Sequence, residues 1–485
     1  MSATAALVVA AALAGCGTTT YFAGRVLPPS GLTNRVLIAI QNPSAFTKGA
    51  LQIVDAFYDV RFAYNDKKGS FSVSGYSGAL PTTIQNMPEQ QLGAVYGSGD
   101  GSFTLVNYAK ENTAGSVSGL NGASSSVFIT LNESYAFAAS QGSHVLTVVN
   151  RLTGGSYPLS LPGVYRVSVN QGGSVALAFV QNSNYVYYPR QLTSAQSQAY
   201  SGGPATWPKN AQDCEPQNNP AWCLFQVQSP DHQANDAAGI PYYYGAPLSF
   251  DRPVKAIFSE DGGTAYILNC GPECGGSNAS ISLLPTAPLI FLSGQQSGLL
   301  PKTGAIPNIG TPAGASNALI DSSTMYVTGQ KYMPDGYWGG YLTVVNLLTN
   351  SVVPTSTASP NPVSISDGAP GAVSRMLLAD DNTLWIGMTK CTNGERANNN
   401  QPYGCLTMYN TSTSTVTLLE PYNGDATGIA GVTGLHKIYT AEGGQVYIYL
   451  TTDGTAKDNQ YVTVTGTAYD VAYMDGLTDA NNTVY

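Results

Sequence analysis

The stretch Leu146-Thr147-Val148-Val149-Asn150 returns almost unchanged as Leu342-Thr343-Val344-Val345-Asn346. Looser copies, each a short β-rich run that ends in Asn or Asp, are Leu51-Gln52-Ile53-Val54-Asp55, Phe103-Thr104-Leu105-Val106-Asn107 and Leu406-Thr407-Met408-Tyr409-Asn410. A unit that recurs at a spacing of roughly 40–60 residues is typical of propellers and solenoids, in which each repeat is one supersecondary unit. The repeat therefore predicts an array of similar β units.

Composition agrees with an all-β protein. Of 485 residues, 53 are Gly, 31 are Tyr and only 10% are charged. Clusters of Gly, Asn, Ser and Pro separate short runs of Val, Ile, Thr and Tyr, and no long amphipathic helix pattern occurs. The hydrophobic fraction of 43% is ample for a core. The net charge of −9, with no Lys/Arg cluster, argues against nucleic acid as a partner.

A second motif precedes several of these runs. In Phe258–Asn269, an Asp-Gly turn joins two strand-like segments, and the same frame recurs at 131–137, 169–177, 320–327 and 378–386. The frame resembles the YVTN-type β-propeller repeat, and the resemblance covers roughly residues 34–485. It implies that the first strand of each pair lines a central channel and that the second pairs with it on the outside.

The number of blades follows from the third-strand runs. These lie near residues 51, 103, 146, 185, 281, 342, 406 and 446, which predicts eight four-stranded blades. The run near 185 is the weakest, so seven blades are the alternative. The C-terminal segment Ala468–Gly476 has the pattern of an inner strand with nothing after it. We expect it to pair with Val36–Ile40, because this pairing closes the ring and leaves no free sheet edge.

The first residues predict where in the cell the protein is located. Ala5–Ala14 is an apolar run too short to span a bilayer. It leads into Leu13-Ala14-Gly15-Cys16, which resembles the lipobox of bacterial lipoproteins. The resemblance implies a signal peptide at 1–15, lipid on the Cys16 thiol, a flexible tether at 16–32 and the propeller at 33–485. The protein is then expected in the bacterial cell envelope, membrane-attached through this lipid and facing the periplasm or the cell surface. An ordinary signal peptide with a coincidental cysteine is the alternative.

The other six cysteines form three close pairs. They are Cys214/Cys223, Cys270/Cys274 and Cys391/Cys405. Even, locally paired cysteines in an exported chain predict disulfides. Zinc binding at Cys270-x-x-x-Cys274 is the alternative, but the chain has only three His and none has a ligand-like spacing. We therefore expect three disulfides, no metal site and no cofactor.

Insertions are concentrated in part of the chain. Long connections between second and third strands are expected at 270–278, 330–340 and 389–404, and a larger excursion covers about 191–250. In the propeller family such loops emerge on one face together with the connections between blades, so we expect all four insertions there, with the disulfides inside them. These loops carry candidate binding residues with large, rigid rings. The candidates are Trp207, Trp222, Tyr332, Tyr337, Trp338 and Tyr403. The alternative is that these rings only pack their own loops against the disc.

No catalytic motif is present in the sequence. Acidic turns such as Asp380-Asp381-Asn382 do not match an EF-hand, and His144 and His436 are expected at the surface. We therefore expect a non-enzymatic, lipid-anchored propeller that binds an envelope protein or glycan through its stapled loops. One alternative is an envelope hydrolase or lactonase that uses channel-mouth carboxylates such as Glu260, Asp321 and Asp380. The other is a purely structural part of an envelope assembly.

Overall fold

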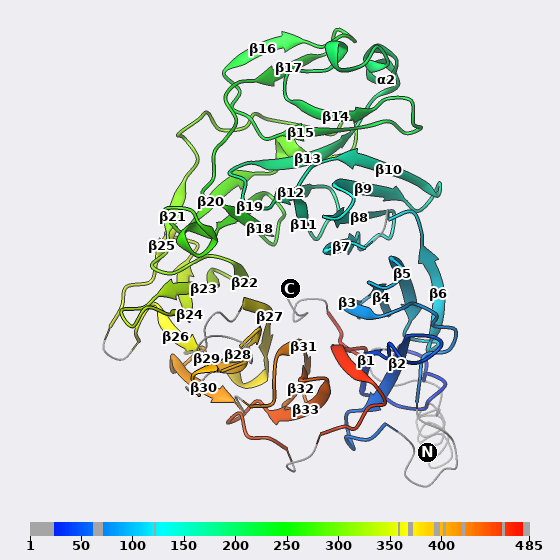
Figure 1. Ribbon diagram of the computed structural model, residues 1–485, viewed down its shortest axis with the longest axis vertical. Coiled ribbons are helices and arrows are strands. Elements are labelled where there is room, and N and C mark those ends of the chain that lie inside the picture. The colour runs from blue at the N-terminus through cyan, green and yellow to red at the C-terminus, as the bar shows by residue number, and fades with distance from the viewer. Residues whose placement is uncertain are drawn as a thin grey trace, which may run out of the picture.

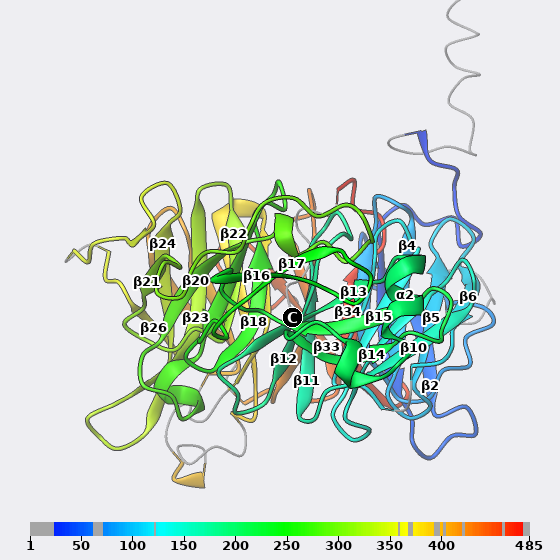
Figure 2. The same cartoon turned by 90° about the horizontal axis from the view of Figure 1, so that it is seen from above.

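The computed structural model describes residues 24–61, 71–120, 123–356, 359–366, 372–391, 398–400, 404–419, 422–457 and 461–478. Eight small antiparallel sheets stand around a central channel, so the fold is a β-propeller (Figure 1). Seen edge-on, the ring is a disc (Figure 2). The prediction of eight blades is confirmed. No helix in the described part of the chain is both long and apolar enough to cross a membrane.

The first four blades are built as follows, from the channel outward. Blade 1 contains β34 (Thr467–Tyr473), β1 (Arg35–Gln41) and β2 (Gly49–Asp55). Blade 2 contains β3 (Pro81–Met87), β4 (Leu92–Gly97), β5 (Ser102–Asn107) and β6 (Asn112–Val117). Blade 3 contains β7 (Ser126–Ile129), β8 (Tyr135–Ser140), β9 (Val145–Asn150) and β10 (Gly155–Ser160). Blade 4 contains β11 (Val164–Val169), β12 (Ala176–Val180), β13 (Val186–Gln191), β15 (Trp222–Gln226) and β14 (Ala211–Glu215).

The remaining blades continue around the ring. Blade 5 contains β18 (Pro253–Phe258), β19 (Thr264–Asn269), β20 (Ser280–Pro285) and β21 (Asn308–Gly310). Blade 6 contains β22 (Asn317–Asp321), β23 (Thr324–Tyr332) and β24 (Trp338–Asn346), with β25 (Ser351–Val352) and β26 (Val363–Ser366) both paired to β24. Blade 7 contains β27 (Ala372–Ala379), β28 (Thr383–Thr389), β29 (Leu406–Asn410) and β30 (Thr415–Leu419). Blade 8 contains β31 (Ala426–Val432), β32 (Lys437–Glu442) and β33 (Gln445–Leu450).

The repeated sequence run forms the third strand of blades 1, 2, 3, 6 and 7, where its apolar residues pack between blades and its closing Asn or Asp begins a turn. In β9, Leu146 and Val148 pack towards blade 4, whereas Val149 packs towards blade 2, so both faces of the strand are buried between neighbours. The closing Asn150 accepts hydrogen bonds from the backbone N–H groups of Leu152 and Thr153, at 3.0 and 3.2 Å. Asn346 and Asn410 make the same turn in blades 6 and 7. The recurrent Asn is therefore a turn former.

The C-terminal segment closes the ring, as predicted. β34 pairs antiparallel with β1, and Val36 lies opposite Tyr473. A buried ion cluster holds the junction: Arg35 Nη2 is 2.6 Å from Asp475 Oδ1, and Arg35 Nη1 is 2.9 Å from Glu111 Oε1 of blade 2. Burial opposes the charge on Arg35, but hydrogen bonds and attraction from both carboxylates outweigh it and raise the pKa of the guanidinium. The N-terminal and C-terminal segments are thus joined by strand pairing and by buried ion pairs.

The excursion at 191–250 differs from the prediction. It was expected on the loop-bearing face, but it lies on the outer rim of blade 4 (Figure 1). Its strands β15 and β14 extend the blade to five strands, followed by the hairpin of β16 (His232–Asn235) and β17 (Pro241–Tyr244). Cys214 and Cys223 are register partners in β14 and β15, so this disulfide lies inside a blade and not in a loop.

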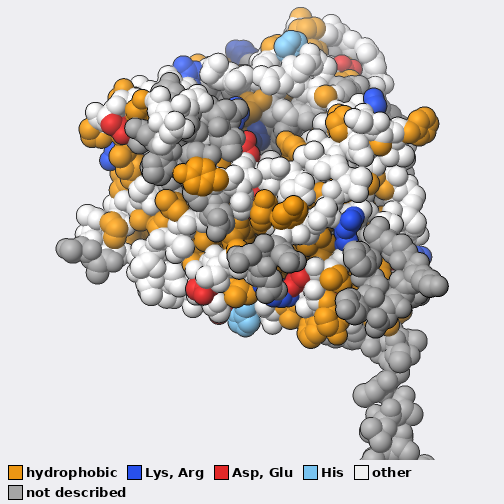
Figure 3. Space-filling model, turned by 60° about the horizontal axis from the view of Figure 1, so that its bottom comes forward, with side chains coloured by type: hydrophobic (Ala, Val, Ile, Leu, Met, Phe, Trp, Pro, Cys, Tyr) orange, Lys and Arg blue, Asp and Glu red, His pale blue; other side chains and the backbone are white. Residues whose placement is uncertain are grey.

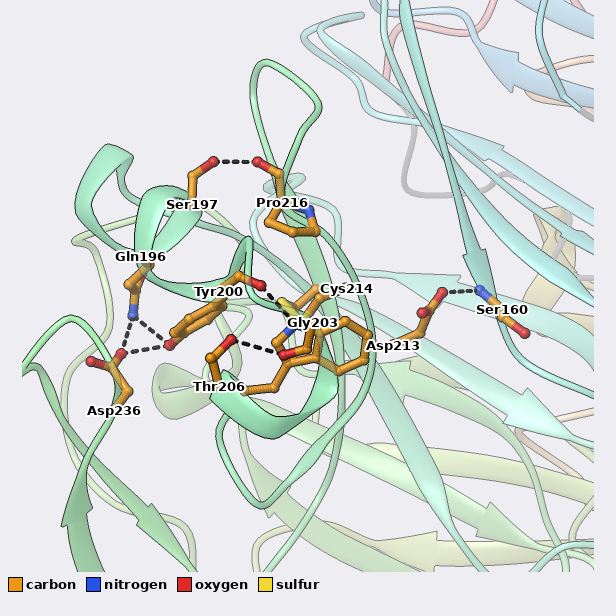
Figure 4. Close-up of a disulfide and its surroundings, with 12 residues drawn as sticks. Ser160, Gln196, Ser197, Tyr200, Gly203, Thr206, Asp213, Cys214, Pro216 and Asp236 are labelled. Atoms are coloured by element: carbon orange, nitrogen blue, oxygen red, sulfur yellow. Dashed lines mark hydrogen bonds between the residues drawn. A yellow bond between two sulfur atoms is a disulfide. The ribbon is translucent and has the colours of Figure 1, made fainter.

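Short polar contacts hold the rim insertion together and join it to the disc (Figure 4). Helix α2 (Ser194–Tyr200) carries Tyr200, whose hydroxyl donates to Asp236 at 2.5 Å. Asp213 in β14 accepts a hydrogen bond from the Ser160 N–H of blade 3, at 2.6 Å. The insertion is therefore a packed extension of the blade. The described chain also contains 3-10 helices at Pro204–Thr206, Gly271–Cys274, Ala287–Leu289 and Asp380–Asn382.

The other three insertions do share a face. They join second to third strands in blades 5, 6 and 7, and alternation of strand direction brings these connections and the links between blades to one side of the disc, here called the loop face. The insertions touch one another. The Gln330 N–H donates to Glu273 at 2.8 Å, and Asn399 Nδ2 donates to the Tyr337 hydroxyl at 3.0 Å. A continuous wall therefore spans three blades.

Candidate functional site

The inner strands share a bulge near their loop-face ends. In β11 the pairing with β12 skips Tyr165, so one extra residue is inserted before Arg166. Equivalent register shifts occur in five further inner strands. The residues that follow the bulges are Thr83, Arg166, Lys255, Arg375, Gly428 and Asp470. Because a bulge redirects the side chain that follows it, this ring of positions surrounds the channel at one depth.

Three of these positions are cationic, and the three cations act on one another. The pKa of Lys255 is lowered well below its usual value, mainly by burial and then by the charges of Arg166 and Arg375. Burial also lowers the pKa of Arg166, with a smaller contribution from Arg375. The channel therefore concentrates positive charge in a poorly solvated place. Figure 3 shows basic and acidic side chains together in a hollow of the displayed face.

The cations differ in their partners. Lys255 Nζ donates to Asn317 Oδ1 at 2.7 Å, and Arg375 Nη2 lies 3.5 Å from Asp470 Oδ2. Arg166 forms no hydrogen bond or ion pair with any residue that the structure describes, and its side chain stays partly solvent-accessible in the channel. Its guanidinium is thus available to an outside group.

Asp470 is the carboxylate of this ring. It accepts the Ile84 N–H at 2.7 Å, and burial raises the pKa of its carboxyl while Arg375 lowers it. Gly428 makes room for it, because a Cβ there would lie 2.6 Å from Asp470 Oδ1. The described members of the ring thus carry three cations against one carboxylate.

A cavity of about 330 Å³ lies at the loop face, and Arg166 is the member of this ring that lines it. Its lining includes Tyr165, Arg166, Arg252, Glu273, Ser316 and Val373, from blades 4 to 7. This volume is within the range of small-ligand pockets. The mouth of the channel is therefore a concave site with a free arginine in its wall.

Glu273 adds a carboxyl group that titrates near neutrality. It sits in the 3-10 turn closed by the Cys270–Cys274 disulfide, and burial raises its pKa from 4.5 to about 7, despite hydrogen bonds from the Gln330 N–H and Ser316. The disulfide fixes the turn that places this carboxyl against blade 6. Because Cys270 and Cys274 are bonded to each other, the structure supports the disulfide and not the alternative of zinc binding.

The third disulfide, Cys391–Cys405, closes the blade 7 insertion at its base. Asp425 lies beside these two sulfur atoms, and the three residues form a cluster of metal-ligand type. Cysteines that are bonded to each other are not available as thiolate ligands. The structure therefore gives this cluster a structural role.

The predicted aromatic residues fall into two groups. Tyr332, Tyr337 and Trp338 gather at the tip of the β23–β24 hairpin, where the rings of Tyr332 and Trp338 meet edge to face at 5.5 Å. The hairpin is more regular than expected, because its strands pair as far as Tyr332 and Trp338. Tyr332 is 61% exposed, so this tip presents aromatic surface on the loop face.

The tryptophans of the rim insertion do not form a binding surface. Trp222 is fully buried and packs against Tyr135 and Phe291, so its assignment as a binding residue is wrong. Trp207 is half-buried, packs against the blade 4 core and donates its Nε1–H to the Tyr200 carbonyl at 3.2 Å. Trp207 therefore packs its own insertion against the disc, which is the alternative stated from the sequence. Tyr403 and Cys16 lie outside the described residues.

The carboxylates named from the sequence lie elsewhere. Glu260, Asp321 and Asp380 occupy turns between first and second strands in blades 5, 6 and 7, on the face opposite the loop face. Asp380 accepts the Gly434 N–H at 2.8 Å, which is a structural contact. His436 is exposed at that face and pairs with Asp381 at 2.8 Å. The charged residues that line the cavity are therefore a different set, Arg166, Arg252 and Glu273, of which Arg166 follows a bulge.

No protein family and no curated protein matches this sequence. Similar solved structures include Kuenenia stuttgartiensis hydrazine synthase, with TM-score 0.43, 12% identity, and coverage of 87% of this chain and 98% of that chain. Dihydro-heme d1 dehydrogenase NirN has TM-score 0.47, 10% identity and coverage of 96% and 78%. The periplasmic gluconolactonase of Pseudomonas aeruginosa has TM-score 0.39, 14% identity and coverage of 91% and 98%. Likeness at this level leaves function to be argued from the site.

Proposed function

We propose that this protein is a binding module that holds an anionic partner, carried on a protein or a glycan, at the loop-face mouth of its channel. The observation that carries the proposal is Arg166, a guanidinium in the channel wall without a partner among the described residues. An uncompensated charge in such a place is unfavourable for folding, so its retention needs a reason. An anion that enters the mouth supplies the missing charge-assisted hydrogen bonds.

The surroundings support an anion more than a neutral ligand. Arg375 adds positive charge near Arg166, and low-dielectric channel walls focus that field towards the opening. The wall of insertions beside the cavity is stapled by two disulfides, which lowers the ordering entropy lost on binding. The exposed aromatic tip around Tyr332 offers rigid contact area for the rest of the partner.

The test is binding of poly-glutamate to the full chain, with neutral dextran for comparison. Arg166→Met should weaken polyanion binding at least tenfold, because hydrogen bonds to charged groups contribute about 1.5–3 kcal/mol. The matched control is Arg151→Met, since Arg151 is paired with Glu133 on the surface at 2.9 Å. Equal polyanion affinity in the wild type and Arg166→Met, or equal affinity for dextran, would refute the proposal.

A second candidate function is hydrolysis, and Glu273 is the observation that favours it. A carboxyl with a pKa of about 7 is poised for general acid or base chemistry, and it lines the same cavity as Arg166. A hydrolase of this kind should open small lactones, and Glu273→Gln should abolish turnover while leaving polyanion binding in place. If the wild-type protein binds polyanions but hydrolyses no lactone, hydrolysis is refuted and the binding function remains.

We also propose that the chain is anchored in the bacterial envelope through lipid on Cys16. The first described residues support a defined orientation. Arg25 Nη2 donates to the carbonyls of Pro88 and Gly476, which follow inner strands on the face opposite the loop face. An anchor that precedes Arg25 would then leave the loop face pointing away from the membrane. Cys16→Ser should move the protein from the membrane fraction to the soluble fraction, and equal membrane retention would refute the anchor.

A further inference from the structure

A second cavity lies on the rim, away from the channel. It has a volume of about 320 Å³ and is formed between blade 4, the β16–β17 hairpin and the 288–300 connection of blade 5. It shares no lining residue with the cavity at the channel mouth. The excursion at 191–250 therefore builds a separate concave site.

Two polar groups in this rim cavity have unmet hydrogen-bonding capacity. Arg190, in β13, forms no hydrogen bond or ion pair with any described residue, and its Nε is buried without a partner. Asn210 Oδ1 is also buried without a partner. Buried polar groups in native proteins are nearly always satisfied, so two unsatisfied groups in one cavity call for an explanation.

The charged surroundings of Arg190 do not supply that partner. Asp236 is the carboxylate that acts on Arg190, but its oxygens are occupied by Tyr200, Gln196 and the backbone N–H groups of Ala238 and Ile240. Arginine stays protonated even where burial opposes its charge. The rim cavity therefore contains a cation whose counter-charge must come from outside.

The rest of the lining indicates what accompanies that counter-charge. Tyr188, Tyr242 and Tyr243 supply aromatic surface, and Gln228 and Gln296 supply side-chain amides. Aromatic faces suit the apolar C–H faces of a sugar ring, while amides suit its hydroxyl groups. A guanidinium suits a carboxylate, which it can bind through two parallel hydrogen bonds.

We propose that the rim cavity is a binding site for an acidic sugar unit, with its carboxylate on Arg190 and a hydroxyl donating to Asn210. This site does not depend on the function proposed for the channel mouth. The probe is D-glucuronate, with D-glucose as the neutral counterpart, titrated into the full chain by calorimetry. Glucuronate should bind at least tenfold more tightly than glucose.

Three variants decide the assignment. Arg190→Met should weaken glucuronate binding at least tenfold without lowering the melting temperature, because it removes an uncompensated charge. Asn210→Asp should also weaken it at least tenfold, since a second carboxylate would face that of the ligand. Arg166→Met should leave glucuronate binding unchanged while reducing polyanion binding, which separates the two sites. Absence of glucuronate binding to the wild type, equal affinity for glucose, or unchanged affinity in Arg190→Met with normal melting would overturn the proposal.

Discussion

Arg35 and Arg166 both lie deep in the disc, one at the closure between blades 1 and 2 and the other in the channel wall. Arg35 is bonded to Asp475, Glu111 and the Tyr108 carbonyl, and its side chain is 1% exposed. Arg166 has none of these contacts within the described chain. Every guanidinium nitrogen of Arg35 donates a hydrogen bond within the protein, whereas no guanidinium nitrogen of Arg166 donates one to a described residue. The contrast separates a charge that holds the ring from a charge that serves a partner.

The substitution Arg35→Met tests whether Arg35 holds the ring closed, and we expect it to have the largest effect on the free energy of unfolding. The substitution leaves Asp475 and Glu111 buried without their counter-charge. Removing one partner of a buried ion pair typically costs about 3–5 kcal/mol of stability. Denaturant unfolding followed by fluorescence measures the change. A loss below 1 kcal/mol would show that the closure does not depend on this cluster.

The same substitution at the other site, Arg166→Met, should have the opposite sign. It removes a partly buried cation that repels Lys255 and Arg375. Replacement of buried ionic groups by apolar ones is often neutral or stabilising by about 1–4 kcal/mol. The same unfolding experiment applies, and a destabilisation similar to that of Arg35→Met would mean that Arg166 is a structural residue after all.

A smaller and pH-dependent effect is expected for Glu273→Gln. The pKa of Glu273 is 4.5 when exposed and about 7 in the fold, so the folded state binds this proton more tightly. The free energy of unfolding of the wild type therefore falls as pH rises from about 4.5 to about 7. The variant should match the wild type near pH 4 and exceed its stability at pH 8, by roughly 1–3 kcal/mol. A difference that is independent of pH would contradict the shifted pKa.

The smallest effect should come from His436→Gln on the opposite face. A hydrogen bond that the ring donates to the Asp381 carboxylate raises the pKa of His436 above 6.5. The stabilisation from the charged ring is complete below pH 6.5 and is lost as pH rises through the folded-state pKa. The variant should therefore melt slightly below the wild type at pH 5.5 and together with it at pH 9. A difference in melting temperature that persists at pH 9 would show that the effect comes from packing and not from the charge on His436.

The sequence predicts the architecture well because the blades repeat. Five of the eight third strands end in a turn-forming Asn or Asp, and the β-rich run alone predicts the other three, β13, β20 and β33. The closure was also predictable, because a solitary inner strand at the C-terminus needs a partner. The pairing of the three disulfides followed from short sequence separations in the same way.

The candidate site was not predictable, for a physical reason. Alternation along a strand predicts which side chains share a face, but a bulge inserts one residue and changes the face of those that follow. Arg166, Lys255 and Arg375 therefore look like unrelated charges in the sequence. The expected loop around Trp222 is instead strand β15, Trp222–Gln226, in which four of the five residues are apolar. That apolar run was the available signal for a strand.

Closure of the ring by its last strand also sets the timing of assembly in the cell. Arg35 and Asp475 are 440 residues apart, which at typical synthesis speeds of about 5–20 residues per second means a wait of roughly 20–90 s. Throughout that interval β1 lacks its inner neighbour and presents an unpaired edge. A chain of this design needs a chaperone that covers this edge until its final segment emerges.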